Sequence, residues 1–140
     1  MIKSTLFLST LILLLASCSD DSLSDKLQGD NYSATILCTS PALGDGLTGV
    51  SIEPGAENEF TITYGGQYGS MVGSIDDNDN LTILPYNTTL DDGTVLDYVG
   101  GSGEFRIDTI MNTTTPIKVL GITMDDENGQ ACLFNLFEEE

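Results

Sequence analysis

The 140-residue chain contains no histidine and no tryptophan, and only four of its residues are lysine or arginine. Without histidine there is no Ser-His-Asp or Cys-His catalytic arrangement, no imidazole general base and no His-Glu-x-x-His zinc site. The acidic residues give a formal net charge of -18 at pH 7, so the surface repels phosphate backbones and we expect no nucleic-acid partner. No Gly-Lys-Ser/Thr phosphate loop occurs. These absences predict a protein that is not an enzyme and has no cofactor.

Cysteine is also scarce, and the first of the three, Cys18, follows a segment with the layout of a secretory signal. Lys3 supplies a positive charge and residues 6–15 form an apolar run, which is too short for a bilayer span of roughly 20 residues. The quartet Leu15-Ala16-Ser17-Cys18 resembles a bacterial lipobox. This resemblance implies a signal peptide over residues 1–17 and a mature protein whose Cys18 carries diacylglycerol and an amide-linked chain such as palmitate.

Residues 18–30 are rich in Ser and Asp and poor in apolar side chains, so we expect a lipidated Cys followed by a flexible acidic tether. Ser19-Asp20-Asp21 resembles the acidic export tag of surface lipoproteins in Bacteroidota-type bacteria, which implies an outer-membrane protein that faces the cell exterior. Asp21-Ser22-Leu23 matches the short O-glycosylation motif of the same bacteria and makes Ser22 a candidate modification site. Asp108-Thr109-Ile110 matches the same motif.

Residues 31–140 remain for one domain, and their dominant hydrophobic period is two. In Glu59–Tyr64 the apolar side chains alternate with polar ones, which is typical of a half-buried strand. Runs with this pattern are Tyr32–Thr39, Met71–Ile75, Leu81–Tyr86, Thr94–Val99, Glu104–Ile110, Ile117–Met124 and Ala131–Phe137. Turn signals such as Asp91-Asp92-Gly93 and Asn128-Gly129 separate them. The spacing predicts an all-β barrel or sandwich.

The two remaining cysteines favour a closed barrel. Cys38 lies near the end of the first predicted strand and Cys132 near the start of the last, each in phase with apolar neighbours. Because the first and last strands of a closed antiparallel barrel are neighbours, a Cys38–Cys132 disulfide would join them, and export permits its formation. Two buried free thiols on facing strands are the alternative. A metal site is not expected, because the domain has no third cysteine and no histidine.

A family resemblance follows from three motifs in order: Leu81-Thr82-Ile83-Leu84-Pro85-Tyr86, then Asp92-Gly93, then Gly101-Ser102-Gly103-Glu104-Phe105, ahead of a hairpin that leads to Cys132. This order resembles the small lipocalin-like (calycin-like) β-barrel domains of Bacteroidota lipoproteins, over roughly Tyr64 to Phe137. The resemblance implies a small antiparallel up-and-down barrel of about eight strands. The sequence departs from the family in having Leu84 between Ile83 and Pro85, and no functional residue carries over.

Three features have competing interpretations. Ile117–Met124 carries apolar side chains on both faces, so the face that does not fill the barrel is either covered or exposed. We expect the segment Pro41–Gly49 to form a long loop that covers it. The acidic run Asp76–Asn80 lacks the glycine and glutamate of an EF-hand loop and is predicted to be a solvated turn. Asp97, although it lies between apolar residues, is predicted to face water.

Together these features predict a membrane-anchored barrel that acts by binding rather than catalysis. As a binding module for a small ligand, it would need a cavity with gaps at Gly73 and Gly121. The aromatic side chains predicted to line that cavity are Tyr64, Tyr86, Tyr98 and Phe105. As an accessory subunit that binds a surface protein, it would instead have a filled barrel and an apolar outer patch.

Overall fold

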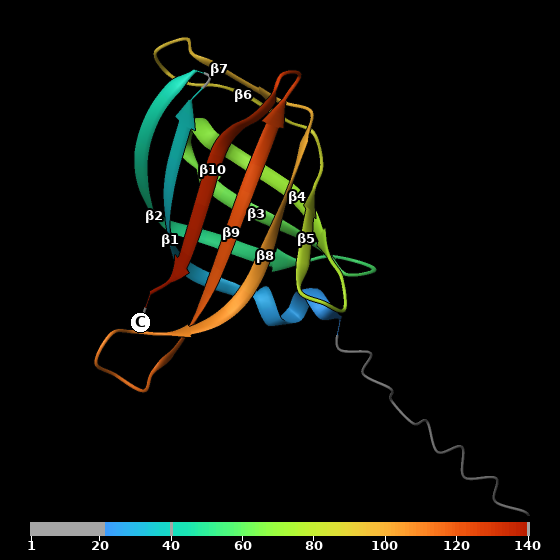
Figure 1. Ribbon diagram of the computed structural model, residues 1–140, viewed down its shortest axis with the longest axis vertical. Coiled ribbons are helices and arrows are strands. Elements are labelled where there is room, and N and C mark those ends of the chain that lie inside the picture. The colour runs from blue at the N-terminus through green and yellow to red at the C-terminus, as the bar shows by residue number, and fades with distance from the viewer. Residues whose placement is uncertain (1–21, 40, 140) are drawn as a thin grey trace, which may run out of the picture.

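The computed structural model describes residues 22–39 and 41–139, which form a closed antiparallel barrel (Figure 1). Around the barrel the strand order is β1-β10-β9-β8-β5-β4-β3-β2. The barrel strands are β1 (Gly29–Thr39), β2 (Ala42–Pro54), β3 (Glu59–Gly65), β4 (Gly69–Ile75), β5 (Asn80–Ile83), β8 (Gly100–Thr109), β9 (Pro116–Asp126) and β10 (Gly129–Glu138). The predicted all-β fold and eight-strand antiparallel barrel are confirmed, whereas the predicted signal peptide and Cys18 lie outside the described residues.

The barrel closes where the first strand meets the last. β1 pairs antiparallel with β10 along most of its length, and Cys38 lies directly opposite Cys132 in this ladder. The two residues form a disulfide. The predicted disulfide across the closure of the barrel is therefore confirmed, and the alternative of two free thiols is wrong.

Strict alternation of side chains fills the interior. In β3, for example, Phe60, Ile62 and Tyr64 are buried while their neighbours in sequence are half-buried or exposed. An eight-strand barrel has an interior just wide enough for side chains to fill. The buried side chains that the barrel strands direct inward include Tyr32, Ile36, Ile52, Phe60, Ile62, Met71, Leu81, Leu120, Ile122, Met124, Phe134 and Leu136.

One end of the barrel is plugged by the 3-10 helix η1 (Leu23–Leu27) and is called here the η1 end. Leu27 is fully buried, and its carbonyl accepts a hydrogen bond of 2.8 Å from the Tyr32 hydroxyl. The flexible tether predicted over residues 18–30 is thus wrong for residues 22–30, because the helix and the first residues of β1 already belong to the barrel. A few apolar side chains among Ser and Asp are enough here, because Leu27 is fully buried in the hydrophobic core of the barrel.

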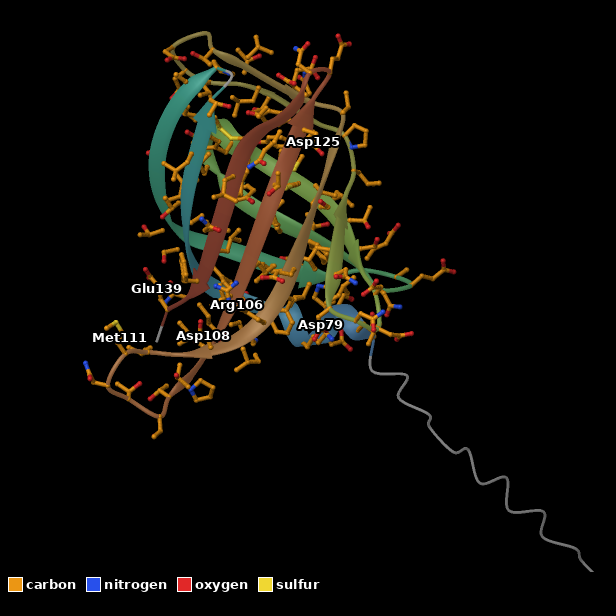
Figure 2. The ribbon with its side chains drawn as sticks, in the orientation of Figure 1. Asp79, Arg106, Asp108, Met111, Asp125 and Glu139 are labelled. Atoms are coloured by element: carbon orange, nitrogen blue, oxygen red, sulfur yellow. A yellow bond between two sulfur atoms is a disulfide. The ribbon has the colours of Figure 1, made fainter. Side chains whose placement is uncertain are left out.

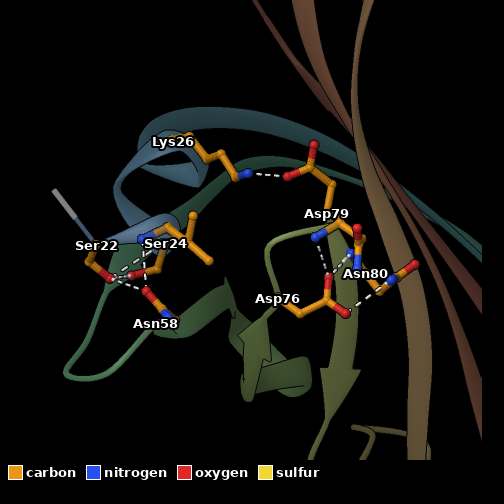
Figure 3. A network of polar contacts seen from close by, with 9 residues as sticks. Ser22, Ser24, Lys26, Asn58, Asp76, Asp79 and Asn80 are labelled. Atoms are coloured by element: carbon orange, nitrogen blue, oxygen red, sulfur yellow. Dashed lines mark hydrogen bonds and ion pairs between the residues drawn. The ribbon is translucent and has the colours of Figure 1, made fainter.

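Polar contacts hold η1 against two turns of the barrel (Figure 3). The Ser22 side chain caps the helix by accepting from the Ser24 amide, and it donates to the Asn58 side chain in the β2–β3 turn. The Leu23 amide donates to the same Asn58 oxygen at 2.8 Å. Lys26 forms an ion pair with Asp79 in the β4–β5 turn.

The opposite end, called here the cap end, is covered by a separate hairpin of β6 (Tyr86–Thr89) and β7 (Val95–Tyr98). We call this hairpin the cap; it lies beside the short 3-10 helix η2 (Gly66–Tyr68). The predicted strand Leu81–Tyr86 is therefore two strands, because Pro85 has no N–H to continue a ladder. Thr94–Val99 was also predicted as a barrel strand, but β7 pairs with β6 alone.

The predicted covering loop Pro41–Gly49 is wrong, because this segment belongs mainly to β2 and pairs with β1. Gly44 and Gly46 of this segment lie on the outer face of the barrel opposite Leu37 and Thr35, where no side chain is needed for packing. The segment therefore does not cover the outward apolar side chains of β9 and β10.

Within the described part of the chain, no helix combines the length and the apolar character needed to cross a bilayer.

Candidate functional site

The three tyrosines predicted to line a ligand cavity meet at the cap end. The Tyr86 and Tyr98 rings stack with centroids 6.2 Å apart, and both rings belong to the cap. Phe134 joins them from β10, with its centroid 6.3 Å from Tyr86 and 5.5 Å from Tyr64. All four side chains are at least 96% buried. We call Tyr64, Tyr86, Tyr98 and Phe134 the aromatic cluster. It contains three of the four residues that were predicted to line a ligand cavity.

The hydroxyl groups of the cluster already have partners inside the protein. Tyr86 donates to the backbone carbonyl of Tyr68 at 2.5 Å. Tyr98 donates to the disulfide sulfur of Cys38 at 3.5 Å, and Tyr64 donates to the Met71 sulfur at 3.9 Å. Sulfur is a weak acceptor, so the last two contacts satisfy the hydroxyls only weakly.

Burial controls the ionisation of these phenols. It raises the pKa of Tyr64 well above the ordinary value of 10.0, and the neighbouring Tyr86 raises it further. The pKa of Tyr86 is raised in the same way, first by burial and then by Tyr98. For Tyr98, burial is the largest cause of the raised pKa and Asp126 is the second. At neutral pH the phenols of the cluster are therefore protonated and uncharged.

Phe105 does not join the cluster. It lies at the η1 end, where the Lys26 ammonium is 5.7 Å from its ring centroid and the Phe105 amide donates to the Asp79 carbonyl at 2.9 Å. The predicted grouping of Phe105 with the three tyrosines is therefore wrong, because the alternation placed it inside the barrel but did not determine its height along the axis.

The two glycines predicted to leave gaps do not open the interior. A Cβ at Gly73 would lie 2.7 Å from the Phe60 ring and 2.8 Å from Ile83, so neighbouring side chains already occupy this space. Gly121 faces outward, and the nearest atom to its added Cβ would be the Asn135 side-chain oxygen at 3.6 Å. The interior around the predicted ligand residues is packed.

Gly121 instead helps to form a hollow on the outside of the barrel, which we call the outer groove. Gly121 lies opposite Glu104 on β8 and Asn135 on β10. The groove has a volume of about 640 Å³. Its lining side chains on β5, β8, β9 and β10 include Asn80, Thr82, Ser102, Glu104, Arg106, Thr123 and Asn135.

The face that carries the outer groove has few charges for a protein of this composition. One row of outward residues crosses it from strand to strand, and each pairs with the next: Gly44, Leu37, Leu133, Thr123, Ser102, Thr82 and Ser74. The adjacent row contains Gly46, Thr35, Asn135, Gly121, Glu104 and Asn80. Glu104 is the one carboxylate in the two rows, and it pairs with Arg106 at 3.2 Å. These two rows are called the uncharged face below, because the ion pair of Glu104 with Arg106 leaves them without net charge.

The apolar outward residues are only partly covered. Val119 is buried between its register partners Arg106 and Phe137. Leu133 is half-buried, and Leu37 opposite it is 52% exposed. An apolar spot therefore adjoins the outer groove, as expected if this face is not covered by a loop.

The acidic turns do not assemble a metal site. The Asp76 carboxylate accepts from the Asn78 and Asn80 amides and from the Asn80 side chain, and the side-chain bond from Asn80 contributes most to lowering its pKa. Asp97 is exposed, as predicted, in a small hollow with Asp126 and Glu127. Among residues 22–39 and 41–139, no three acidic or cysteine side chains are placed to hold an ion.

The two candidate glycosylation sites differ in solvent exposure. Ser22 is half-buried, and its hydroxyl contacts Ser24 at 2.7 Å and Asn58 at 3.2 Å. Thr109, in the second motif match, is exposed at the end of β8. Glycosylation at Ser22 stays a prediction, and Ser22 would have to release Asn58 to accept a sugar.

Comparisons with protein-family models, curated proteins and solved structures find no match to this chain. The resemblance to lipocalin-like lipoproteins therefore stays a prediction beyond the barrel itself. Sequence reasoning missed the outer groove. The signal for it was the small outward residues Gly121 and Thr123 on one strand and Ser102 on another. They form a groove only when β8 and β9 pair in the observed register.

Proposed function

We propose that this protein is a lipid-anchored, non-catalytic interaction module that binds a surface protein through its uncharged face. The observation that carries the proposal is the packed interior: Tyr64, Tyr86 and Tyr98 contact one another or Phe134, and the space beside Gly73 is occupied. We therefore expect a partner to bind the outer surface of the barrel. The anchor in this proposal is the predicted lipid on Cys18, in an outer membrane with the barrel toward the cell exterior.

The chemistry of the uncharged face supports a protein partner. Carboxylates repel most acidic partners and are costly to bury, and interface cores are depleted in charged residues. The uncharged face offers hydroxyl and amide groups around the outer groove and the apolar Leu37 and Leu133 beside it. The face thus combines a patch that can be desolvated with polar groups that can orient a partner.

Native mass spectrometry of the protein extracted gently from its host tests this proposal. We expect a second polypeptide at a fixed ratio, lost in the Thr123→Lys variant and kept in the Val95→Lys variant. Thr123 lies in the outer groove, whereas Val95 is an exposed residue of the cap, so both variants add one charge to a strand surface. A bare mass in all three proteins would contradict the proposal. The anchor has its own test: the Cys18→Ala variant should leave the membrane fraction.

A second candidate is a small ligand beneath the cap, and the connections of the cap favour it. The cap forms no ladder with the barrel and is held mainly by side-chain contacts, such as the bond from Tyr86 to Tyr68 and that from Thr88 to the Gln67 carbonyl. If the cap lifts, Tyr86 and Tyr98 leave with it and the interior opens. A bound small mass in the spectrum, without a second polypeptide, would favour this candidate over the first.

A further inference from the structure

The loop between β8 and β9, residues 110–115, exposes apolar side chains at the η1 end of the barrel. Met111 is 87% exposed at its tip and Ile110 is 37% exposed beside it. Ile107 on the adjoining strand β8 is 58% exposed. Figure 2 shows Met111 in this loop, at the opposite end of the barrel from Asp125.

The backbone of this loop is held in place by its own hydrogen bonds. The Thr113 amide and hydroxyl both bond to the Ile110 carbonyl at 2.9 Å, and the Ile110 amide donates to the Thr115 carbonyl at 3.4 Å. The loop therefore presents Ile110 and Met111 without using them to pack its own turn.

Its lack of charge sets this loop apart from the other turns at the η1 end. The β2–β3 and β4–β5 turns there each contain Glu or Asp, whereas residues 109–117 contain no charged side chain. The charged residues on either side are paired: Asp108 lies 3.7 Å from Arg106, and Lys118 lies 3.2 Å from Glu138. The tip can thus enter a less polar medium without desolvating an unpaired carboxylate.

The described part of the chain begins at the η1 end, a few residues after the predicted anchor Cys18. Ser22 begins the described structure beside Asn58 in the β2–β3 turn at the η1 end. Cys18 lies four residues earlier, and four extended residues span at most about 14 Å. A lipid on Cys18 would therefore keep the η1 end close to the headgroups.

We propose that the tip formed by Ile110 and Met111 inserts into the boundary between headgroups and acyl chains of the membrane that holds the Cys18 lipid. The inference rests on the proposed lipid anchor and goes beyond it, because it gives the barrel a second membrane contact and an orientation. Membrane attachment is strengthened when a lipid is combined with a second signal. The basic residues of the described chain, Lys26, Arg106 and Lys118, all lie on the elements of this end.

The absence of tryptophan allows a direct test. The lipidated full chain carrying Met111→Trp is reconstituted in phosphatidylcholine vesicles, with and without brominated acyl chains, and its fluorescence is recorded. The vesicles are zwitterionic because Glu139 lies at the same end. The control is Val95→Trp, which replaces an exposed residue of the cap at the other end.

We expect the emission of Met111→Trp to move to shorter wavelength in vesicles and to be quenched by brominated lipid. The emission of Val95→Trp should keep the wavelength that it has in water and resist the quencher. If the protein floats with vesicles but both variants fluoresce as in water, the tip contact is wrong and the anchor stands. If the protein does not float with vesicles, both the anchor and the tip contact are wrong.

Discussion

The two ends of the barrel are closed by different chemistry. At the cap end an aromatic cluster and a disulfide lie beneath a hairpin whose turn is acidic. At the η1 end a short helix is fastened by hydrogen bonds and an ion pair to neighbouring turns (Figure 3). Apolar contacts resist salt and acid, whereas partly exposed ion pairs contribute little and are screened. The difference predicts that the cap end supplies most of the stability.

The largest effect should come from the disulfide at the cap end. The Cys38→Ala/Cys132→Ala double variant should lose about 4 kcal/mol of unfolding free energy, because the bridge closes a long loop in the unfolded chain. The sequence separation of the two cysteines is 94. Urea unfolding followed by circular dichroism measures this loss. Wild-type protein with reductant should match the double variant, and a double variant that still responds to reductant would contradict the assignment.

The next largest effect compares an inward-facing residue of β10 with an outward-facing one. Phe134→Ala removes a fully buried ring that touches Tyr64 and Tyr86, and it should cost about 3 kcal/mol. Phe137→Ala, on the outward face of the same strand, should cost about 1 kcal/mol or less. Unfolding in urea compares the two. Equal losses would show that the aromatic cluster is not the packed centre of the cap end.

A smaller effect tests how the cap is held. Tyr86→Phe leaves the buried Tyr68 carbonyl without its donor and should cost about 1–2 kcal/mol. Tyr98→Phe removes only a contact with sulfur and should cost about 0.5 kcal/mol or less. Hydrogen exchange of the cap amides should rise more in Tyr86→Phe. The reverse order would mean that Tyr98, and not Tyr86, fixes the cap.

The smallest effect concerns acid and the η1 end. Hydrogen bonds from Asn80 lower the pKa of Asp76, so its contribution to stability is present above the ordinary value of 3.8 and is lost as pH falls through the lowered folded-state value. Between about pH 5 and pH 3, wild-type stability should therefore fall slightly more than that of Asp76→Asn. Asp77→Asn in the same turn is the control for the loss of one charge. An identical acid profile for wild type and Asp76→Asn would contradict the role of these bonds.

The strands with regular alternation were predictable because period two alone places Phe60, Ile62 and Tyr64 inside a barrel. The pairing of Cys38 with Cys132 followed from the same reasoning, since closure makes the first and last strands neighbours. Strand β2 was missed because Gly44 and Gly46 resemble loop residues, and their outward orientation depends on pairing with β1.

The site was harder to predict than the fold. Burial of Tyr64, Tyr86 and Tyr98 was predictable from alternation, but a cavity among them was not, because packing depends on distances that a linear pattern does not contain. The uncharged face arises from residues on several strands that meet only in the observed register. Its continuity is a property of the assembled sheet.

Ionisation of the five tyrosines tests the central claim, a packed barrel with a closed cap end, most directly. Burial raises the pKa of each tyrosine above 10.0, so folding is favoured below that value and loses stability as pH rises beyond it. Tyrosinate absorbance and circular dichroism should be measured together from pH 8 upward, starting well below the ordinary phenol pKa of about 10. We predict that tyrosinate appears only as the barrel unfolds, in one shared transition. Tyrosines that ionise reversibly near pH 10 while the circular dichroism stays native would show an open interior and contradict the account.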